Sequence, residues 1–321
     1  MVSVKILGID IGGTKSGIIL AEYNGSEVNF LEKTSFPTPA TPDDTIKTLL
    51  ADCKKILQNH KDITAAGINC GGPLNSKTGV ILCPPNLPGW INIPIVDIFK
   101  AELNIPCYLQ NDANAGAIAE HLFGAGRGFD NIMFLTHGTG MGAGLILNGK
   151  LYSGTNDMAG EVGHIRLERF GPVGFGKSGS FEGFCSGGGI SRLAESMALE
   201  KLQMGEPVSF YPNHRSQIDV KTIADAAGAG DELAKEIFAI SGTYLGRAIA
   251  LFIDILNPEC ILLGSIYGRC KDLLYDSMMR EIKKESLVFS REVCKIEACG
   301  LGEAINDYEA VAIGIYGVNG A

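Results

Sequence analysis

The sequence predicts an α/β protein built from two lobes. Its 321 residues correspond to two domains at roughly 150 residues each. Hydrophobic residues make up 45% of the chain and charged residues 20%, which is the composition of a globular protein. The order strand–strand–strand–helix–strand is predicted twice, starting near residues 4 and 131, and this repetition indicates an internal duplication.

The first predicted unit opens directly on a strand, and glycine turns separate its strands. A helix is expected to run from Asp43-Asp44, which we expect to cap it, to Asn59, because apolar side chains recur along this segment with helical spacing. A buried strand follows and ends at Gly71-Gly72-Pro73. The predicted strands of this unit are 4–11, 16–22, 28–34 and 65–69.

The second predicted unit follows a strand at 107–110 and a helix that begins at about Asp112. Its predicted strands are 131–136, 143–147, 150–153 and 260–263, and its predicted helices are 190–201, 220–227 and 232–256. A last helix is predicted at 309–316. We therefore expect a lobe of residues 1–113, joined by the C-terminal helix at about 305–321, and a larger lobe of residues 114–304, with a cleft between them.

The charge balance argues against two classes of partner. Lys and Arg number 27 and Asp and Glu number 36, which gives a net charge of −9. Nucleic acids and anionic membranes both require a concentrated basic face, so neither is expected as a partner. The N-terminus lacks the pattern of a signal peptide, and no stretch approaches about 18 uncharged apolar residues, so no membrane span is expected.

The nine cysteines are scattered, and no two of them have CxxC spacing. An odd number of cysteines without a spacing pattern is not typical of a disulfide framework. The pattern favours reduced, mostly buried thiols in a cytoplasmic protein.

Glycine is unusually abundant, at 42 of 321 residues, and it lets backbone N–H groups approach an anion. Residues 171–178 (GPVGFGKS) match the P-loop pattern, but they lack the buried strand before them and the helix after them that a P-loop needs. Residues 138–144 fit a degenerate dinucleotide fingerprint. They lead into a strand rather than a helix, which disfavours a nicotinamide-dependent dehydrogenase.

The segment Asp10-Ile11-Gly12-Gly13-Thr14-Lys15 is the third glycine-rich candidate, and it joins two predicted strands. A carboxylate, two glycines and a hydroxyl donor in this order can hold a metal-bound phosphate. Residues 138–144 have the same setting in the second unit. Two phosphate-binding turns of this kind are the pattern of the superfamily of sugar kinases, actin and Hsp70, and the alternative is two ordinary glycine-rich hairpins.

A series of motifs extends this pattern over almost the full chain. They are DIGGTK (10–15), GINCGGPLN (67–75), PNLPGW (85–90), NDANAGAIAE (111–120), THGTGMGAGLILNG (136–149), AGEVGHIRL (159–167), FEGFCSGGGI (181–190) and ILLGS (261–265). In this combination and order the chain resembles the ROK family of repressors, open reading frames and kinases. Family repressors carry an N-terminal helix-turn-helix segment, and only a few residues precede the first strand here, so the kinase branch is expected.

The resemblance implies a fold and an activity. The implied fold is the two-lobed, ribonuclease H-like fold of the actin-like ATPases. The implied activity is transfer of the γ-phosphate of ATP, with Mg²⁺, to a hydroxyl of a hexose or N-acetylhexosamine, usually the 6-hydroxyl as in a glucokinase. Family members are commonly oligomeric, so a homo-oligomer, either a dimer or a tetramer, is expected.

Asp112 is the expected general base. It follows the predicted strand at 107–110 and opens a helix, and a carboxylate within reach of a sugar hydroxyl can take its proton as the bond to phosphorus forms. The residues alone leave a second interpretation open, in which Asp112 is the N-cap of that helix. The family resemblance favours the base.

The resemblance also implies which residues bind the substrates. On the sugar side these are Gly72, Pro73, Asn86, Asn111, Glu161, His164 and Glu182. On the nucleotide side they are Asp10, Gly12, Gly13, Thr14, Lys15, Thr139, Gly140, Gly264 and Ser265, with Mg²⁺ near Asp10. Simpler readings are a surface ion pair for Glu161, a core histidine for His164 and a core position for Trp90. The other histidines are expected to be structural or at the surface, and they are His60, His121, His137 and His214.

The sequence departs from the family in one segment. Many members have a CxCGxxGCxE segment after the ExGH motif, and its three cysteines bind a structural zinc together with the histidine. Val173, Phe175 and Ser180 occupy the three positions here, so His164 has no cysteine partners and no zinc site is expected. We expect apolar packing of Val173 and Phe175 to hold this loop instead.

Two questions of function stay open from the sequence. The main alternative to a kinase is a catalytically silent, sugar-sensing regulator of the same family. The sugar itself is not named, because glucose, N-acetylglucosamine, N-acetylmannosamine, fructose and allose differ at one or two positions, which single hydrogen bonds can discriminate.

Overall fold

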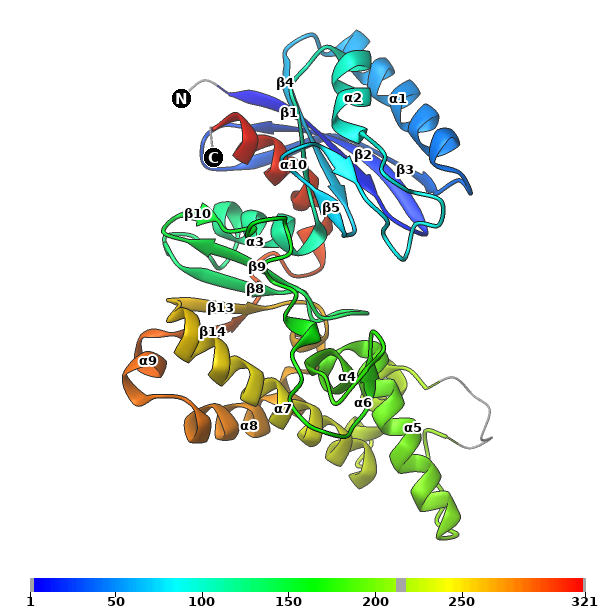
Figure 1. Cartoon of the computed structure of the whole chain (residues 1–321), viewed down its shortest axis with the longest axis vertical. Helices are drawn as coiled ribbons and strands as arrows, with labels where there is room; N and C mark the ends of the chain where they lie inside the picture. The colour runs from blue at the N-terminus through cyan, green and yellow to red at the C-terminus, as the bar shows by residue number, and fades with distance from the viewer. Residues whose placement is uncertain (1–2, 212–217, 320–321) are drawn as a thin grey trace. The chain divides into compact units, whose positions relative to one another are not determined.

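The computed structural model describes residues 3–211 and 218–319, and it forms two compact units (Figure 1). Unit 1 comprises Met1–Phe134, Gly144–Ala159 and Gly300–Ala321, and unit 2 comprises Leu135–Ala143 and Gly160–Cys299. The predicted division into residues 1–113 with about 305–321 and residues 114–304 stays a prediction. His214 lies outside the described residues.

The first five-stranded sheet belongs to unit 1 and has the order β3-β2-β1-β4-β7. Its first three strands form an antiparallel meander, and β4 and β7 continue the sheet parallel to β1. The parallel strands therefore all end at the same edge. The strands are β1 (Val4–Ile11), β2 (Lys15–Tyr23), β3 (Val28–Pro37), β4 (Ile63–Cys70) and β7 (Cys107–Gln110).

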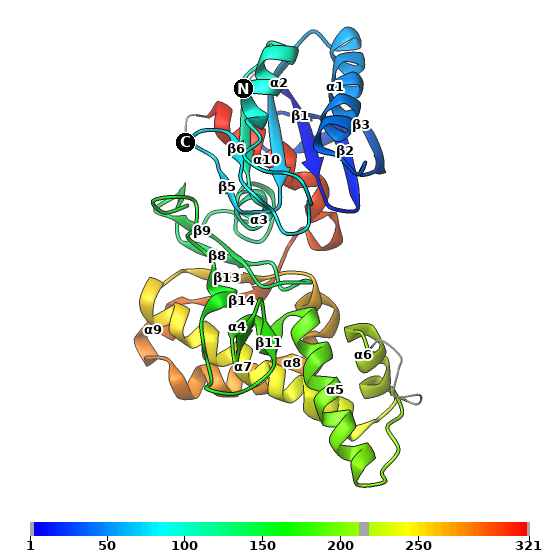
Figure 2. The same ribbon diagram turned by 45° about the vertical axis from the view of Figure 1, so that its right-hand side comes forward.

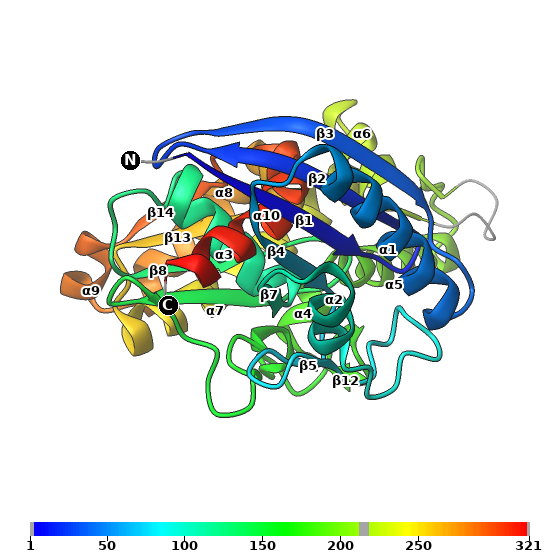
Figure 3. The ribbon, with the colours of Figure 1, turned by 90° about the horizontal axis from the view of Figure 1, so that it is seen from above.

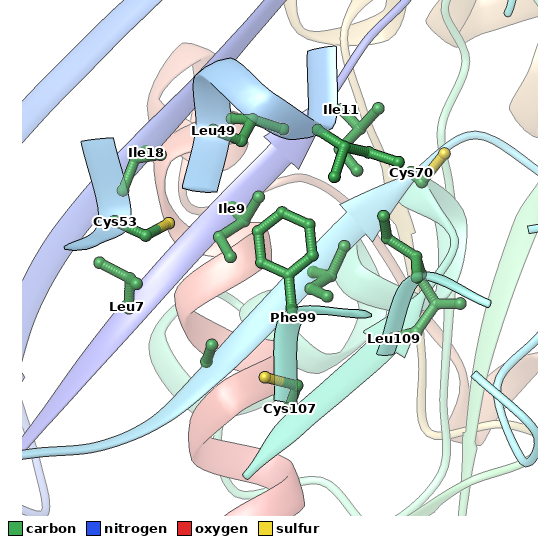
Figure 4. Packing of buried hydrophobic residues seen from close by; sticks show 14 of the residues in the cluster. Leu7, Ile9, Ile11, Ile18, Leu49, Cys53, Cys70, Phe99, Cys107 and Leu109 are labelled. Atoms are coloured by element: carbon green, nitrogen blue, oxygen red, sulfur yellow. The ribbon is translucent and has the colours of Figure 1, made fainter. Parts of the chain in front are cut away.

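Helices cover both faces of this sheet (Figure 3). On one face, α1 (Pro42–Asn59) and α2 (Ile95–Leu103) enclose the larger hydrophobic cluster of the unit. In Figure 4, Leu7, Ile9 and Ile11 of β1 lie in this cluster with Phe99 of α2. On the other face, α10 (Ile305–Val318) buries its apolar side chains against β1 and β4, with the end of α3 (Asp112–Phe123) beside it.

Glycine allows α10 to lie unusually close to β4. A Cβ atom on Gly67 would lie 2.0 Å from the carbonyl oxygen of Ala310 and 2.5 Å from the backbone nitrogen of Gly314. Any larger residue at position 67 would push the helix away from the sheet. The close approach brings Glu309, the neighbour of Ala310, to the carboxyl end of β4.

The second five-stranded sheet has the order β10-β9-β8-β13-β14, which repeats the topology of the first sheet. This repetition confirms the duplication predicted from element order. The strands are β8 (Ile132–Leu135), β9 (Ala143–Leu147), β10 (Lys150–Leu151), β13 (Cys260–Leu263) and β14 (Lys295–Ala298). Within unit 2, β13 and β14 are parallel.

Helices make up most of unit 2, and α7 (Glu232–Leu256) lies alongside α8 (Ile266–Glu285) (Figure 2). By length and composition α7 could cross a membrane, but half of its most apolar window is buried inside the protein. The helices of this unit are α4 (Phe181–Cys185), α5 (Gly187–Gln203), α6 (Val220–Gly228), α7 (Glu232–Leu256), α8 (Ile266–Glu285) and α9 (Val288–Val293). Short elements are β5 (Leu74–Asn75), β6 (Val80–Ile81), β11 (Val173–Gly174), β12 (Lys177–Ser178), and the 3₁₀ turns Val162–His164 and Gly302–Ala304.

The structure corrects one detail of the first helix. The predicted caps, Asp43 and Asp44, lie inside α1, and Thr41 is its N-cap. The side chain of Thr41 accepts a hydrogen bond from the backbone N–H of Asp44. The two carboxylates lie in the first turn, where negative charge interacts favourably with the helix dipole. All nine cysteines are free thiols, and six of them are buried.

Candidate functional site

Unit 1 contains a pocket of about 590 Å³ at the carboxyl ends of its parallel strands. Ligands commonly bind at this edge of α/β sheets, because the loops that follow the strands meet there. The predicted site residues that line the pocket are Asp10, Gly12, Gly13, Lys15, Gly72, Asn86 and Asp112. The structure therefore brings predicted nucleotide residues, predicted sugar residues and the predicted base together within one unit. Thr14, Pro73 and Asn111 are their neighbours in the chain.

The first glycine turn is closely packed. A Cβ atom on Gly13 would lie 2.3 Å from the carbonyl oxygen of Asn86, and one on Gly12 would lie 2.6 Å from that of Lys15. Thr38 donates from its hydroxyl to the Gly12 carbonyl at 2.6 Å, and its backbone N–H donates to the Thr14 carbonyl at 3.0 Å. The residue that follows β3 thus holds the backbone of the turn in place. The side chains of Thr14 and Lys15, within the turn, are exposed.

Asp112 is the first residue of α3, and its neighbour Asn111 is the N-cap. The side-chain oxygen of Asn111 accepts from the backbone N–H of Asn114 at 2.8 Å. The interpretation of Asp112 as the N-cap is therefore wrong, because Asn111 occupies that position. Oδ1 of Asp112 accepts from the N–H of Ala113 at 2.9 Å, which orients the carboxylate at the pocket.

Two buried residues that were not among the predicted site residues lie beside this carboxylate. Asn69, at the end of β4, donates from Nδ2 to Asp10 Oδ1 and to Glu309 Oε2, at 3.1 Å in each case. Glu309 comes from α10, and both Asn69 and Glu309 line the pocket. An acidic residue in the apolar run of the last predicted helix was the only available signal for Glu309.

Burial raises the pKa values of all three carboxyl groups at this pocket. The pKa of Asp10 rises to about 6, mainly through lost hydration and against a hydrogen bond from Asn69. Asp112 borders solvent, but the surrounding protein removes enough hydration to raise its pKa as well. The pKa of Glu309 lies well above its usual range, because burial is reinforced by the charges of Asp112 and Asp10. Such clusters of perturbed acids are typical of functional sites.

The second glycine turn lies in unit 2, beside a pocket of about 800 Å³. The hydroxyl of Thr136 accepts from the Gly142 N–H at 3.1 Å, and Gly138 N–H donates to the Gly140 carbonyl at 3.1 Å. Of the predicted nucleotide residues in this unit, Thr139 and Ser265 line the pocket, and Gly140 and Gly264 adjoin them. Ser265 has a φ of 39°, in the region that favours glycine.

Several lining residues of this second pocket were not predicted. Gly187 and Gly188 form the first turn of α5, and Arg192 and Arg269 line the same pocket. The N-terminus of α5 and the two guanidinium groups can attract an anionic ligand, and the acidic residues Glu195 and Asp219 line the same pocket. The segment SGGG at 186–189 belongs to a motif quoted above, whereas the two arginines have no sequence pattern that marks them.

The predicted sugar residues of unit 2 lie on short elements. Glu161 precedes the 3₁₀ turn Val162–His164, His164 is the last residue of that turn, and Glu182 lies in α4. Glu182 Oε2 accepts from the backbone N–H of Met141 at 3.2 Å, which joins this carboxylate to the second glycine turn. His164 is exposed, so the reading of it as a core histidine is wrong. Trp90 lies in the hydrophobic core of unit 1.

The loop that carries zinc in many family members is a short hairpin here. Val173 and Phe175 are 43% and 70% exposed, so the expectation that their apolar packing holds the loop is wrong. Phe175 keeps a ring contact with His164 at 5.6 Å. Hydrogen bonds hold the hairpin, including one from Lys177 Nζ to the His164 carbonyl at 2.6 Å and one from the Ser178 hydroxyl to the Gly171 carbonyl at 2.9 Å. Within residues 3–211 and 218–319, no three His, Cys, Asp or Glu residues are placed to hold a metal ion together.

Solved structures of similar proteins share this fold. A ROK family glucokinase from Streptomyces griseus, solved in complex with glucose and AMPPNP, is 28% identical, with a TM-score of 0.75 over 97% of this chain and 99% of that chain. A ROK family transcriptional regulator, described as a homolog of the E. coli MLC protein, is 28% identical, with a TM-score of 0.84 over 96% of this chain and 77% of that chain. The chain thus has the α/β fold of the actin-like ATPases.

Curated sequences give the same picture. A glucokinase from Halalkalibacterium halodurans is 32% identical over 88% of this chain and 86% of its own length. An N-acetylmannosamine kinase from Escherichia coli is 32% identical over 84% of this chain and 85% of its own length. A profile of the ROK family matches residues 6–305, which is nearly the whole sequence. The chain belongs to the ROK family.

Proposed function

We propose that this protein is a sugar kinase that transfers the γ-phosphate of ATP to a hydroxyl of a hexose or N-acetylhexosamine, with the 6-hydroxyl as the expected acceptor. The observation that carries the proposal is that Asp112 and the glycine turn of residues 10–15 line one pocket of unit 1. Phosphoryl transfer requires a base for the acceptor hydroxyl next to a group that holds phosphate. The names of the relatives support the same class of reaction.

In the proposed reaction, Asp112 accepts the proton of the sugar hydroxyl. The hydroxyl oxygen forms a bond to the γ-phosphorus while the bond from that phosphorus to the bridging oxygen of the β-phosphate breaks, which releases ADP. The raised pKa of Asp112 makes it a stronger base than an ordinary aspartate. The hydrogen bond from Ala113 N–H to Oδ1 leaves Oδ2 as the oxygen for the proton.

The nucleotide side is proposed to combine residues of both units. Gly12, Gly13, Thr14 and Lys15 would bind phosphate from unit 1, and Thr139, Gly140, Gly264 and Ser265 would bind the nucleotide from unit 2. Asp10 fits a magnesium ion, because it is a carboxylate with raised pKa whose repulsion from its acidic neighbours a divalent cation would relieve. Bound Mg²⁺ would neutralise charge on the transferred phosphate.

The sugar side is proposed to include Gly72, Pro73, Asn86 and Asn111 from unit 1, and Glu161, His164 and Glu182 from unit 2. Because the cap uses the oxygen of Asn111, its Nδ2 is the group available to a sugar hydroxyl. Glucokinases and an N-acetylmannosamine kinase are similarly related to this chain, so both sugar classes belong to the proposal. A cytoplasmic location and a homo-oligomer are part of the same proposal.

The second candidate is a sugar-sensing regulator without catalysis, and the likeness to the regulator structure favours it. Release of ADP from ATP should be measured with Mg²⁺ and each of glucose, N-acetylglucosamine, N-acetylmannosamine, fructose and allose, and sugar binding should be measured by calorimetry. Sugar-dependent ADP release with at least one of them is the expected result. Sugar binding without ADP release would instead support the regulator and contradict the kinase.

A further inference from the structure

We propose that Glu309 is a positioning residue of the nucleotide site, which fixes the amide of Asn69 so that this amide holds the Asp10 carboxylate. The inference rests on the proposed function, in which Asp10 serves the metal-bound nucleotide. Glu309 lies 240 residues from Asn69 in the sequence. No sequence motif described above includes it.

The geometry gives Asn69 a single orientation. A primary amide has two N–H groups, and here Nδ2 donates to Asp10 Oδ1 and Glu309 Oε2, both at 3.1 Å. The acceptors come from different elements, the neighbouring strand β1 and the helix α10, which both pack against β4. Asn69 and Glu309 are only 5% and 7% exposed, so water competes little for these hydrogen bonds. Loss of either acceptor would free the amide to rotate.

The side-chain oxygen of Asn69 shows that this orientation of the amide has an energetic cost. Oδ1 of Asn69 is buried and has no hydrogen-bond partner among the described residues. Buried polar atoms without partners are rare, because their lost hydration is not compensated. A half-turn of the amide would direct this oxygen at the Asp10 carboxylate, which is less favourable still. The structure therefore keeps the two hydrogen bonds from the Asn69 amide to Asp10 and Glu309, while the Asn69 oxygen is left without a partner.

Backbone packing fixes the position from which Glu309 acts. Gly67 lets α10 approach β4 so closely that a Cβ atom there would lie 2.0 Å from the Ala310 carbonyl oxygen. Glu309 begins the apolar part of α10, and the side chains that follow it are buried against the sheet. The carboxyl group is thus held by the helix rather than by a flexible loop, as a positioning role requires.

The charge state of Glu309 is consistent with this role. Its pKa is raised well above the usual range by burial and by the facing carboxylates of Asp112 and Asp10, which favours the neutral, protonated form. A neutral acid supplies an acceptor to Asn69 without adding a third negative charge beside the phosphates. Glutamine should therefore replace it well, whereas leucine, which has no acceptor, should not.

The test compares Glu309→Gln, Glu309→Leu, Asn69→Ala and the double variant Asn69→Ala/Glu309→Leu in the full-length protein. The dissociation constant of AMPPNP with Mg²⁺ is measured by calorimetry, and the KM values for ATP and for the sugar are measured where there is turnover. Glu281→Leu is the control, because Glu281 is equally buried, at 7% exposure, but pairs with Arg247 in unit 2. It should lower the thermal unfolding temperature and leave the affinity for AMPPNP unchanged.

We expect Glu309→Leu and Asn69→Ala each to weaken AMPPNP binding by roughly tenfold, with the KM for sugar within about twofold of wild type. Glu309→Gln should resemble wild type, and the double variant should be no weaker than Asn69→Ala alone, since Glu309 acts through Asn69. Normal binding by Glu309→Leu, equal loss in the Gln and Leu variants, or additive losses in the double variant would each overturn the inference.

Two further outcomes are also decisive. If Glu309→Leu does not fold, normal AMPPNP binding by Asn69→Ala overturns the inference, and tenfold weaker binding supports it. If the wild-type protein phosphorylates no sugar, the proposed kinase function fails, but the binding measurements still decide the role of Glu309.

Discussion

Glu182 and Met141 are joined by a hydrogen bond in which Oε2 of Glu182 accepts from the backbone N–H of Met141 at 3.2 Å. The same oxygen would lie 3.2 Å from a Cβ atom on Gly140. A carboxylate predicted to bind the sugar thus also supports the turn predicted to bind phosphate. Within unit 2, one side chain therefore joins the two predicted substrate sites.

This coupling predicts that Glu182→Ala impairs both substrates. The KM for sugar should rise because a hydrogen-bonding group is lost, and the KM for ATP should rise because the turn loses its support, each by about tenfold. His164→Ala is the comparison, since the His164 ring contacts Phe175 rather than the turn, and this variant should change only the KM for sugar. An unchanged KM for ATP in Glu182→Ala would contradict the coupling.

The packing of the first glycine turn predicts that Gly13→Ala damages the nucleotide site. Its Cβ atom would lie 2.3 Å from the Asn86 carbonyl oxygen, which is backbone and cannot move independently. We expect a loss of about 2 kcal/mol in the free energy of unfolding and a strongly raised KM for ATP. Gly228→Ala is the control, because nothing lies within 4 Å of its Cβ position at the end of α6. If urea unfolding gives the two variants the same free energy of unfolding, the first glycine turn is not as closely packed as the structure indicates.

The buried His137 predicts a loss of stability at acidic pH. Burial lowers its pKa from 6.5 to about 4, so the folded state stays unprotonated where the unfolded state binds a proton. The contribution of neutral His137 to the free energy of unfolding is therefore complete above pH 6.5 and is lost as the pH falls towards 4. The free energy of unfolding should decline by about 1.4 kcal/mol per pH unit in this window relative to His137→Asn.

The free energy of unfolding must be compared with that of His137→Asn, because the titration of Asp10 changes this free energy in the opposite direction. Its folded pKa of about 6 exceeds its unfolded value of 3.8, so its contribution is lost as the pH rises through this range. This effect is common to wild type and variant and cancels in their difference. Urea unfolding at pH 8, 6 and 5 measures that difference, and parallel curves would show that His137 titrates normally.

The hairpin of residues 173–178 predicts stability without zinc. Hydrogen bonds to the His164 and Gly171 carbonyls hold it, and no cysteine lies at the three positions that bind zinc in many relatives. Protein purified without added zinc should contain far less than one equivalent by elemental analysis, and EDTA should leave its unfolding temperature unchanged. One equivalent of tightly bound zinc would contradict this expectation.

Much of the fold follows from local sequence patterns. Strands such as β1 and β9 were predicted because apolar runs end at glycine turns, and the duplication was predicted because these runs recur in the same order. The 20-residue helix α8 was not predicted, although it is longer than most helices that were. Its segment is rich in charged residues, and its buried apolar residues form one narrow stripe, at every fourth position from Ile266 to Ile282.

The pocket was predictable to a similar extent. The segments after β1, β4 and β7 meet because parallel strands end at one edge, so Asp10, Gly72 and Asp112 could be expected together. The contact between Asn69 and Glu309 could not, because it depends on how closely α10 approaches β4 in the folded state. The N-cap role of Asn111 also needed backbone angles, since Asn and Asp are equally good caps.

The central claim is that Asp112 is the base for transfer of phosphate to a sugar, and Asp112→Asn tests it most directly. The substitution keeps the size of the side chain and an oxygen that can accept from Ala113 N–H, but the amide cannot take the proton. With the sugar that wild type phosphorylates best, kcat should fall by at least about 100-fold, while sugar affinity by calorimetry changes by less than about fivefold. Turnover equal to wild type would contradict the account.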